Sequence, residues 1–184
     1  QAIRIGFGTT PTLTLTSTYA EGSFSTTFTV DTQPYGTTTV TVYDAIAGTR
    51  VATFTILPNI IELTPNQGSV GTIVTIAGNG FGTGSLVDVI FKDTALGDVL
   101  VISPQATAYG SFSITWTVPT REFGGHIVVG SDTVYHVFAT KSFSVIPNLF
   151  LITPMQGTVG TTISIRGDGF INGDNIDIIF GKTF

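Results

Sequence analysis

The densest group of side chains able to do chemistry lies near the C-terminal end of the sequence and consists of oxygen ligands. Its three acids are Asp168, Asp174 and Asp177, with Asn172 and Asn175 among them. Ca²⁺ binds about six to eight oxygen atoms, so these carboxylates predict a Ca²⁺ site. The alternative is that they are turn residues, because short Asp and Asn side chains bond to nearby backbone. The matching stretch 79–88 holds a single acid, which favours the turn interpretation.

The two histidines, His126 and His136, are the other side chains that could bind a metal. They lie on apparent strands, and the sequence has no cysteine to join them. A metal site needs more convergent nitrogen or sulfur ligands than this pair supplies. We therefore expect structural histidines and, apart from the possible Ca²⁺, no cofactor.

No set of residues predicts catalysis. The Gly-x-Ser-x-Gly motif is absent, and the serines have no histidine and acid near them in the sequence. Asp88 and Asp177 occupy matching positions of a repeated segment. A catalytic pair of carboxylates would more naturally occur once, in a cleft. The chain is therefore predicted not to be an enzyme.

Four aromatic residues could form a platform on which a sugar stacks. They are Trp116, Tyr35, Tyr109 and Phe123. Trp116 alternates with threonines and aligns with Phe28 of an earlier repeat, which is typical of a core position. We therefore expect Trp116 in a core rather than on a binding surface.

An internal repeat determines where all these residues lie. The segment 58–72 recurs as 147–161, 89 residues later, and the similarity continues from 78–91 to 167–180. The first residues of the chain resemble the middle of the same unit, at offsets of 84 to 89 residues.

Three units follow from the repeat. They are the C-terminal part of a repeat (1–58), a complete repeat (59–147) and the N-terminal part of a further repeat (148–184). Both ends are expected to cut through a repeat, which would leave apolar faces and sheet edges open. The end of one copy could complete the start of the next, within a longer chain or between chains.

Alternation of apolar and polar residues predicts strands throughout. Residues 112–118 alternate for seven positions, residues 24–30 do the same in the first unit, and 39–43 and 87–91 follow. Glycine-rich and proline-containing turns separate them, and no stretch shows helical periodicity. About seven short strands in about 90 residues predict an immunoglobulin-like β-sandwich. The expected fold class is all-β, with tandem immunoglobulin-like domains.

Residues 61–81 and 150–170 share the pattern I-x-x-x-P-x-x-G-x-V-G-T-x-[VI]-x-I-x-G-[ND]-G-F, with Phe150 at the first position of the second copy. This pattern resembles the opening of IPT/TIG domains, which are immunoglobulin-like modules of plexins, some transcription factors and many prokaryotic surface proteins. The resemblance implies the fold more strongly than a function. The lack of cysteine is unlike plexin modules, which leaves surface-layer proteins, adhesins and filament subunits of prokaryotes.

The composition limits the partners. Charged residues make up 10% and the net charge is −5, with no basic cluster, so a nucleic acid partner is not expected. No run of 18 apolar residues predicts a membrane-spanning segment. The 33 threonines suit strands whose outer faces are polar but uncharged.

We expect a non-catalytic structural segment of an extracellular or cell-surface assembly, such as a surface layer or a filament. Its partners would be copies of itself or neighbouring repeats, joined through sheet edges and packed domains. The alternative is an adhesin stalk or a carbohydrate-binding accessory module, with a polysaccharide as partner.

Overall fold

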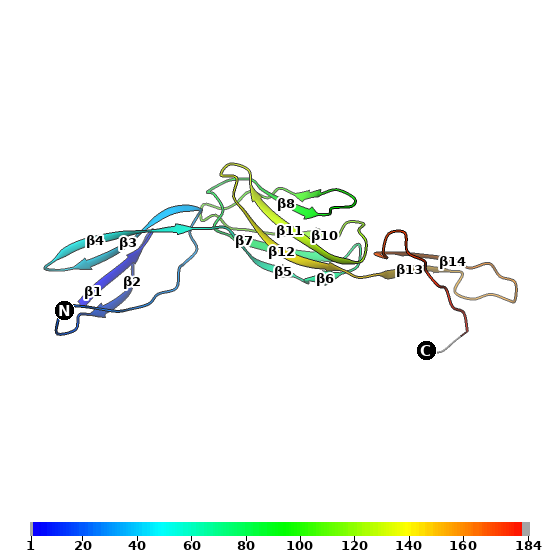
Figure 1. Cartoon of the computed structure of the whole chain (residues 1–184), viewed down its shortest axis with the longest axis horizontal. Coiled ribbons are helices and arrows are strands. Elements are labelled where there is room, and N and C mark those ends of the chain that lie inside the picture. The colour runs from blue at the N-terminus through cyan, green and yellow to red at the C-terminus, as the bar shows by residue number, and fades with distance from the viewer. Residues whose placement is uncertain (1, 182–184) are drawn as a thin grey trace.

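The computed structural model describes residues 2–181, and within this range the regular secondary structure is entirely β-strand. The all-β prediction is therefore confirmed. Figure 1 shows three groups of strands that follow one another along the chain: a sheet of β1 to β4, a sandwich of β5 to β12, and a hairpin of β13 and β14.

The middle of the chain forms a sandwich of two sheets, as the repeat length predicts. The first sheet has the order β10-β7-β5, with bounds Phe112–Thr117, Ile73–Asn79 and Asn59–Thr64. The second has the order β6-β12-β11-β8-β9, with bounds Gln67–Gly68, Phe138–Val145, Gly124–Asp132, Val87–Lys92 and Val99–Ile102. The short β6 runs parallel to β12, and the other pairs are antiparallel. This arrangement is typical of immunoglobulin-like domains.

The core of the sandwich lies between these sheets and follows the alternation in the sequence. On β8, Val87, Val89 and Phe91 point into the core and are fully buried. Val74 and Ile76 of β7 face them from the other sheet. Burial of each such side chain stabilises the fold by about 1.5–3 kcal/mol.

The N-terminal sheet has the order β2-β1-β3-β4, with bounds Thr10–Ser17, Ala2–Phe7, Gly36–Asp44 and Gly48–Ile56. Its buried face carries Ile3, Ile5 and Phe7 of β1. The Phe7 ring packs against Phe28 and Phe54, with centroids 5.5 and 5.6 Å apart. Phe28 comes from the segment that covers this face, so a single length of chain takes the place of a second sheet.

The C-terminal group is a hairpin of β13 (Asn148–Thr153) and β14 (Ser164–Asp168). The hairpin is followed by residues 171–181, which form no strand. Its strands correspond to β5 and β7 of the sandwich, at an offset of 89 residues.

The prediction of a strand over 24–30 is wrong, because these residues form no strand in the structure. Their counterpart is β10, which is held in its sheet by hydrogen bonds to β7. Among the described residues no strand pairs with 24–30. An extended segment without a hydrogen-bonding neighbour does not form a ladder, whatever its alternation.

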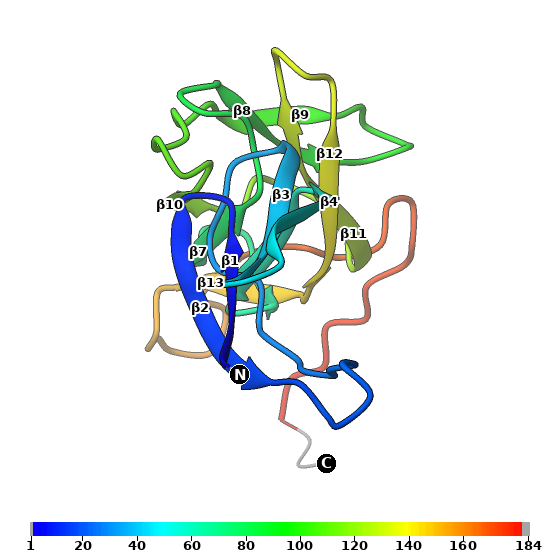
Figure 2. The same cartoon turned by 90° about the vertical axis from the view of Figure 1, so that its left-hand side faces the viewer.

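The three groups lie in a row, with the N-terminal sheet at one end and the hairpin at the other (Figure 1). Figure 2 looks along this row from the N-terminal end, where β1 to β4 lie in front of the sandwich. The N-terminal sheet and the C-terminal hairpin therefore lie on opposite sides of the central sandwich.

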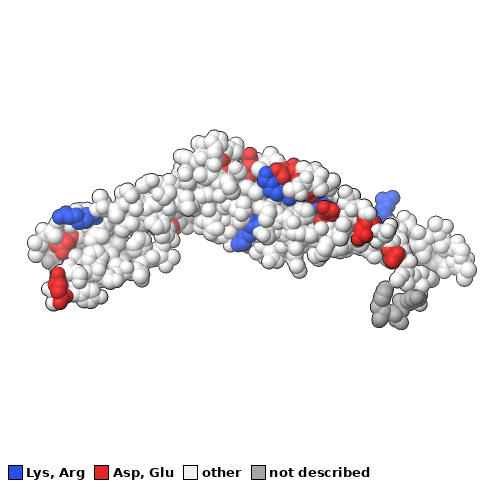
Figure 3. Space-filling model, in the orientation of Figure 1, with Lys and Arg blue, Asp and Glu red and all other residues white. Residues whose placement is uncertain are grey.

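Charged side chains are sparse on the face drawn in Figure 3, and long stretches of it carry none. The uncharged stretches agree with the 10% of charged residues in the sequence. The part of the chain that the structure describes has no helix that could cross a membrane.

Candidate functional site

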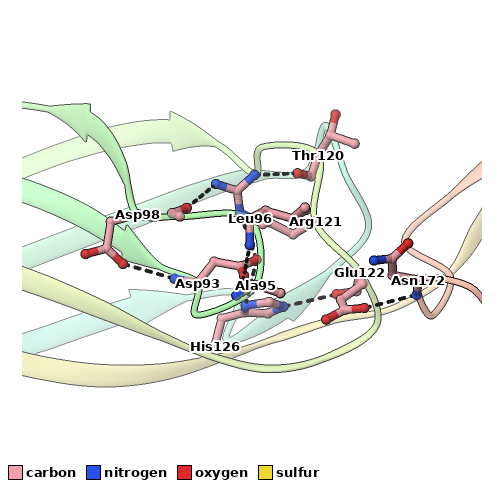
Figure 4. Close-up of polar contacts among 10 residues, drawn as sticks. Asp93, Ala95, Leu96, Asp98, Thr120, Arg121, Glu122, His126 and Asn172 are labelled. Atoms are coloured by element: carbon pink, nitrogen blue, oxygen red, sulfur yellow. Dashed lines mark hydrogen bonds and ion pairs between the residues drawn. The ribbon is translucent and has the colours of Figure 1, made fainter.

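A buried polar cluster contains Asp93, Arg121 and His126, which we call the Asp93 cluster (Figure 4). Asp93 follows directly after β8, Arg121 lies in the loop between β10 and β11, and His126 lies on β11. Antiparallel pairing of β8 with β11 sets Lys92 opposite Ile127, and this brings Asp93 close to His126. All three side chains are buried.

The Asp93 carboxylate closes the turn after β8. Its Oδ1 accepts hydrogen bonds from the backbone N–H groups of Ala95 (2.8 Å) and Leu96 (2.9 Å). The hydrogen bond from Leu96 is the main reason that the pKa of Asp93 lies below its ordinary value. The N–H of Ala95 and the charge of Arg121 lower the pKa further, while burial opposes them. Asp93 is therefore a carboxylate at neutral pH.

Arg121 joins this turn to the loop on which it lies. Its Nε lies 3.0 Å from Asp93 Oδ2, and its guanidinium also donates to the carbonyl groups of Gly97 (2.9 Å) and Thr120 (2.7 Å). A planar guanidinium with several fixed donors suits this task, because it can bond to two carbonyl groups while its charge lies beside Asp93.

His126 completes the cluster. Its Nε2 lies 3.0 Å from the carbonyl oxygen of Glu122, and its Nδ1 lies 3.9 Å from Asp93 Oδ2. The ring stacks on Phe91, with centroids 5.0 Å apart. Both ring nitrogens face groups of the protein itself, so His126 joins the turn after β8 to the loop before β11.

We expect Arg121→Lys to lower the free energy of unfolding of the central sandwich by about 1.5 kcal/mol, because an ammonium group cannot replace both backbone hydrogen bonds and the ion pair with Asp93. Urea unfolding followed by Trp116 fluorescence measures this, since the only tryptophan lies in that core. Arg50→Lys is the matched control, because Arg50 is exposed and donates only to the neighbouring Thr49 carbonyl. Equal effects of the two substitutions would contradict the role given to Arg121.

The acids of the predicted Ca²⁺ site lie around the loop after β14. Asp174 and Asp177 are exposed and line a hollow of about 340 Å³ together with Phe123, whereas Asp168 is half-buried and does not line it. Asp174 accepts a hydrogen bond from the N–H of Asn175, as a turn residue does. Among residues 2–181 no three His, Asp or Glu side chains are grouped as metal ligands. The Ca²⁺ site stays a prediction.

The aromatic residues considered as a sugar platform do not lie on one surface. Trp116 is in the core, as predicted, and its ring packs against Phe91 and Phe143. Tyr35 packs against Tyr135, with centroids 5.3 Å apart, where the N-terminal sheet meets the sandwich. Phe123 lies at the other end of the sandwich, next to the hairpin.

The contact between the N-terminal sheet and the sandwich forms the first joint of the row. The N–H of Tyr35 donates to the carbonyl of Phe81 (2.9 Å), and Tyr35 packs on Tyr135. Phe81 belongs to the Gly-Asn-Gly-Phe motif that begins within the end of β7, and it is fully buried. This motif therefore meets the loop that precedes β3.

The contact between the sandwich and the hairpin forms the second joint, and equivalent residues build it. Phe123 and Phe170 line the same hollow, and they lie 88 and 89 residues after Tyr35 and Phe81. Glu122 Oε2 accepts a hydrogen bond from the N–H of Asn172 at 3.0 Å (Figure 4). Two consecutive joints thus involve the same two positions of the repeat, hydrogen-bonded to each other in the first joint and lining one hollow in the second.

Neither the Asp93 cluster nor the joints were predicted from the sequence. Nothing in the spacing of Asp93, Arg121 and His126 shows that they meet, because the contacts cross between separate strands and loops. The joints could have been found in the sequence, because an aromatic residue comes just before a glycine at both 35–36 and 123–124.

Comparison with known proteins agrees with this geometry. Residues 58–126 match the model of the IPT/TIG domain. Fibrocystin-L of Mus musculus is 28% identical over 142 residues, and Fibrocystin-L of Homo sapiens is 27% identical over 136 residues. These alignments cover 68% and 67% of this chain but only 3% of each relative. The sandwich and its repeat motif therefore identify residues 58–126 as an IPT/TIG immunoglobulin-like domain within an all-β chain.

Proposed function

We propose that this protein is a structural, non-catalytic segment of an extracellular or cell-surface assembly, in which repeats are joined end to end. The observation that carries the proposal is that both joints use the same positions, Tyr35 with Phe81 and Phe123 with Phe170. A joint that repeats with the domain generates a regular row, whereas a binding or catalytic site would more naturally occur once.

The polar chemistry of the molecule supports this role. Asp93, Arg121 and His126 are directed at one another and at backbone groups, so they stabilise the sandwich. The sparse charge allows neutral sheets to pack side by side without repulsion between like charges. The IPT/TIG match favours a place outside the cell, since the resemblance includes many surface proteins.

In this proposal the chain contains part of one repeat (1–58), a complete repeat (59–147) and part of a further repeat (148–184). The changes from one group of strands to the next, at 56–59 and 145–148, support them. At each change, two residues link the last strand of one group to the first strand of the next. Such a short linker restricts bending of the row.

Electron microscopy of native material from cells that make the protein tests the proposal. We expect an ordered surface lattice or fibres with a repeat along the row, decorated by an antibody against the central sandwich. Labelled protein dispersed in the cell interior, or released as single particles, would contradict a structural role at the surface.

A carbohydrate-binding module or adhesin stalk is the second candidate, and exposed tyrosines near the first joint favour it. Tyr109 and Tyr135 are both largely exposed, and Gly110 beside Tyr109 bonds to Phe81. Aromatic faces of this kind can stack on sugars. Retention of the chain on a polysaccharide matrix, lost in Tyr109→Ala, would support this candidate. Electron microscopy would then show isolated beads on a stalk in place of fibres.

A further inference from the structure

The larger sheet of the central sandwich, β6-β12-β11-β8-β9, carries apolar residues on the side that points away from the core. On β8 the buried residues alternate with Asp88, Ile90 and Lys92, which point outward. The strand register places Val129 of β11 and Leu100 of β9 beside Ile90 on this side of the sheet. We call this surface the outer face, and its apolar residues are Ile90, Leu100, Ile102, Ile127, Val129 and Phe138.

Most of these apolar side chains are open to solvent. Leu100 is 58% exposed and Phe138 is 65% exposed, and Ile102 and Ile127 are exposed as well. All of them belong to the central sandwich, in which both sheets are formed, so their exposure does not come from a missing strand. Neighbouring exposed apolar side chains of this kind are typical of an interaction site.

The N-terminal sheet shows that this fold does not need apolar residues on the outer face. Its register places Gly6 opposite Thr41, at the positions that Ile90 and Val129 occupy in the central sandwich. The outward residues of β3 and β4 are mainly threonines, namely Thr37, Thr39, Thr41, Thr49, Thr53 and Thr55. A polar outer face is therefore compatible with the same strand order, and the apolar outer face of the central sandwich needs another explanation.

Two residues of opposite charge lie on the outer face at the two ends of β8. Asp88 is two residues before Ile90 and Lys92 is two residues after it, so all three point the same way. Asp88 Oδ1 accepts a hydrogen bond from Ser103 (2.6 Å), and Lys92 forms an ion pair with Asp98. An ammonium group has three donors and a carboxylate has two acceptor oxygens, so each charged group can bind a further partner.

We propose that the outer face packs against the outer face of a second copy of the chain, with β8 antiparallel to β8 of that copy. This inference rests on the proposed structural role and names the contact that joins rows side by side. A two-fold axis that crosses the strands at Ile90 sets Asp88 of each copy over Lys92 of the other. A two-fold axis along β8 would instead set like charges over each other, which opposes association. The charges on β8 therefore favour a second copy in the antiparallel orientation.

The same axis brings the apolar residues of the two outer faces together. Leu100, Ile90 and Val129 lie in one row across three neighbouring strands. This row follows the axis, so each of its side chains meets its counterpart in the second copy. Sheets that pack face to face lie about 10 Å apart, at which distance their side chains interdigitate and exclude water. The apolar row and the charged pairs thus agree on one arrangement.

The outer face lies on the side of the row, because the central sandwich stands between the N-terminal sheet and the hairpin (Figure 1). Pairing there leaves the two end-to-end joints unchanged. The outer face has far fewer residues than the about 20–30 a side of a standard interface, so we expect a Kd of about 0.1–1 mM between two chains. In an assembly of many chains, multivalency adds such weak contacts together.

Charge reversal on β8 tests the pairing, with association of the chain measured by sedimentation equilibrium. Asp88→Lys leaves two cations on the outer face and Lys92→Asp leaves two anions, so each variant repels its own copies. We expect each variant alone to self-associate at least about tenfold more weakly than the wild-type chain. An equal mixture of the two variants has opposite charges at both contacts, so association should return as a mixed dimer.

The apolar row has its own pair of variants. Leu100→Asp should weaken self-association, whereas Val51→Asp should not, because Val51 is exposed on the corresponding side of the N-terminal sheet. Three results would each overturn the proposal: a wild-type chain that stays monomeric up to about 1 mM, charge variants that associate as well as the wild type, or a mixture that associates no better than its components. Such a failure alongside ordered native fibres would leave the structural role standing, so the two tests are independent.

Discussion

Replacement of Phe91 by alanine is expected to lower the free energy of unfolding of the central sandwich by about 4 kcal/mol. Phe91 is 0% exposed and lies where three rings meet: Trp116 at 5.5 Å, Phe143 at 6.0 Å and His126 at 5.0 Å between centroids. Removal of the ring takes away its burial and leaves a cavity between rigid strands. The stacked His126 would lose its support as well.

The repeat supplies a matched control for this substitution. Phe180 occupies the same position of the next repeat and is 91% exposed. We expect Phe180→Ala to change the free energy of unfolding by less than about 0.5 kcal/mol. Urea unfolding monitored by Trp116 fluorescence reports on the central sandwich in both variants. A Phe91→Ala effect below about 1.5 kcal/mol would contradict the packing described for this core.

The segments with alternating apolar residues show how far the sequence predicts the fold. Alternation in 87–91 and 112–118 predicted strands with alternate side chains in a core, and the structure confirms both. The same alternation in 24–30 produced no strand. The pattern of side chains reports which face of a strand can be buried, but a strand also needs a neighbour to receive its backbone hydrogen bonds.

The candidate sites were harder to predict than the strands for a related reason. The contact between Asp93 and Arg121 joins residues that lie 28 positions apart in the sequence. This separation belongs to no motif, so it does not indicate that the two side chains meet. The oxygen ligands near Asp174 stood out only because they are close in the sequence. Density along the chain is a poor guide to proximity in a β-sandwich, where most contacts join distant residues.

Asp132→Asn is the second substitution with a large expected effect, because it changes a buried carboxylate that organises two loops. Asp132 is 0% exposed, and its two oxygens accept hydrogen bonds from the N–H groups of Val134 and Tyr135 (2.9 Å each) and of Gly82 (2.7 Å). An asparagine has one oxygen, so its NH₂ group must face at least one of these donors. We expect a loss of about 2–3 kcal/mol in the free energy of unfolding, as for a buried donor left unpaired.

Asp44→Asn is the matched control in the N-terminal unit. Asp44 has the same position in the repeat and binds two turn N–H groups, but it is not enclosed in a sandwich. The transition reported by Trp116 should therefore not change in this variant. A shift of that transition equal to the one in Asp132→Asn would show that the effect does not arise from the buried contact with Gly82.

The pH dependence of stability separates the charge of Asp132 from its shape. Burial raises the pKa of Asp132, but the N–H groups of Tyr135, Gly82 and Val134 outweigh it and hold the pKa below the ordinary value of 3.8. A carboxyl group with a lowered pKa stabilises the fold fully above its unfolded pKa, and this stabilisation is lost as the pH falls through the folded value. The wild-type chain should therefore lose stability steadily below about pH 4. Asp132→Asn lacks this group, so the difference in the free energy of unfolding between the wild-type and variant chains should narrow as the pH falls. A difference in the free energy of unfolding that stays constant from pH 7 to pH 2 would contradict an ionised Asp132.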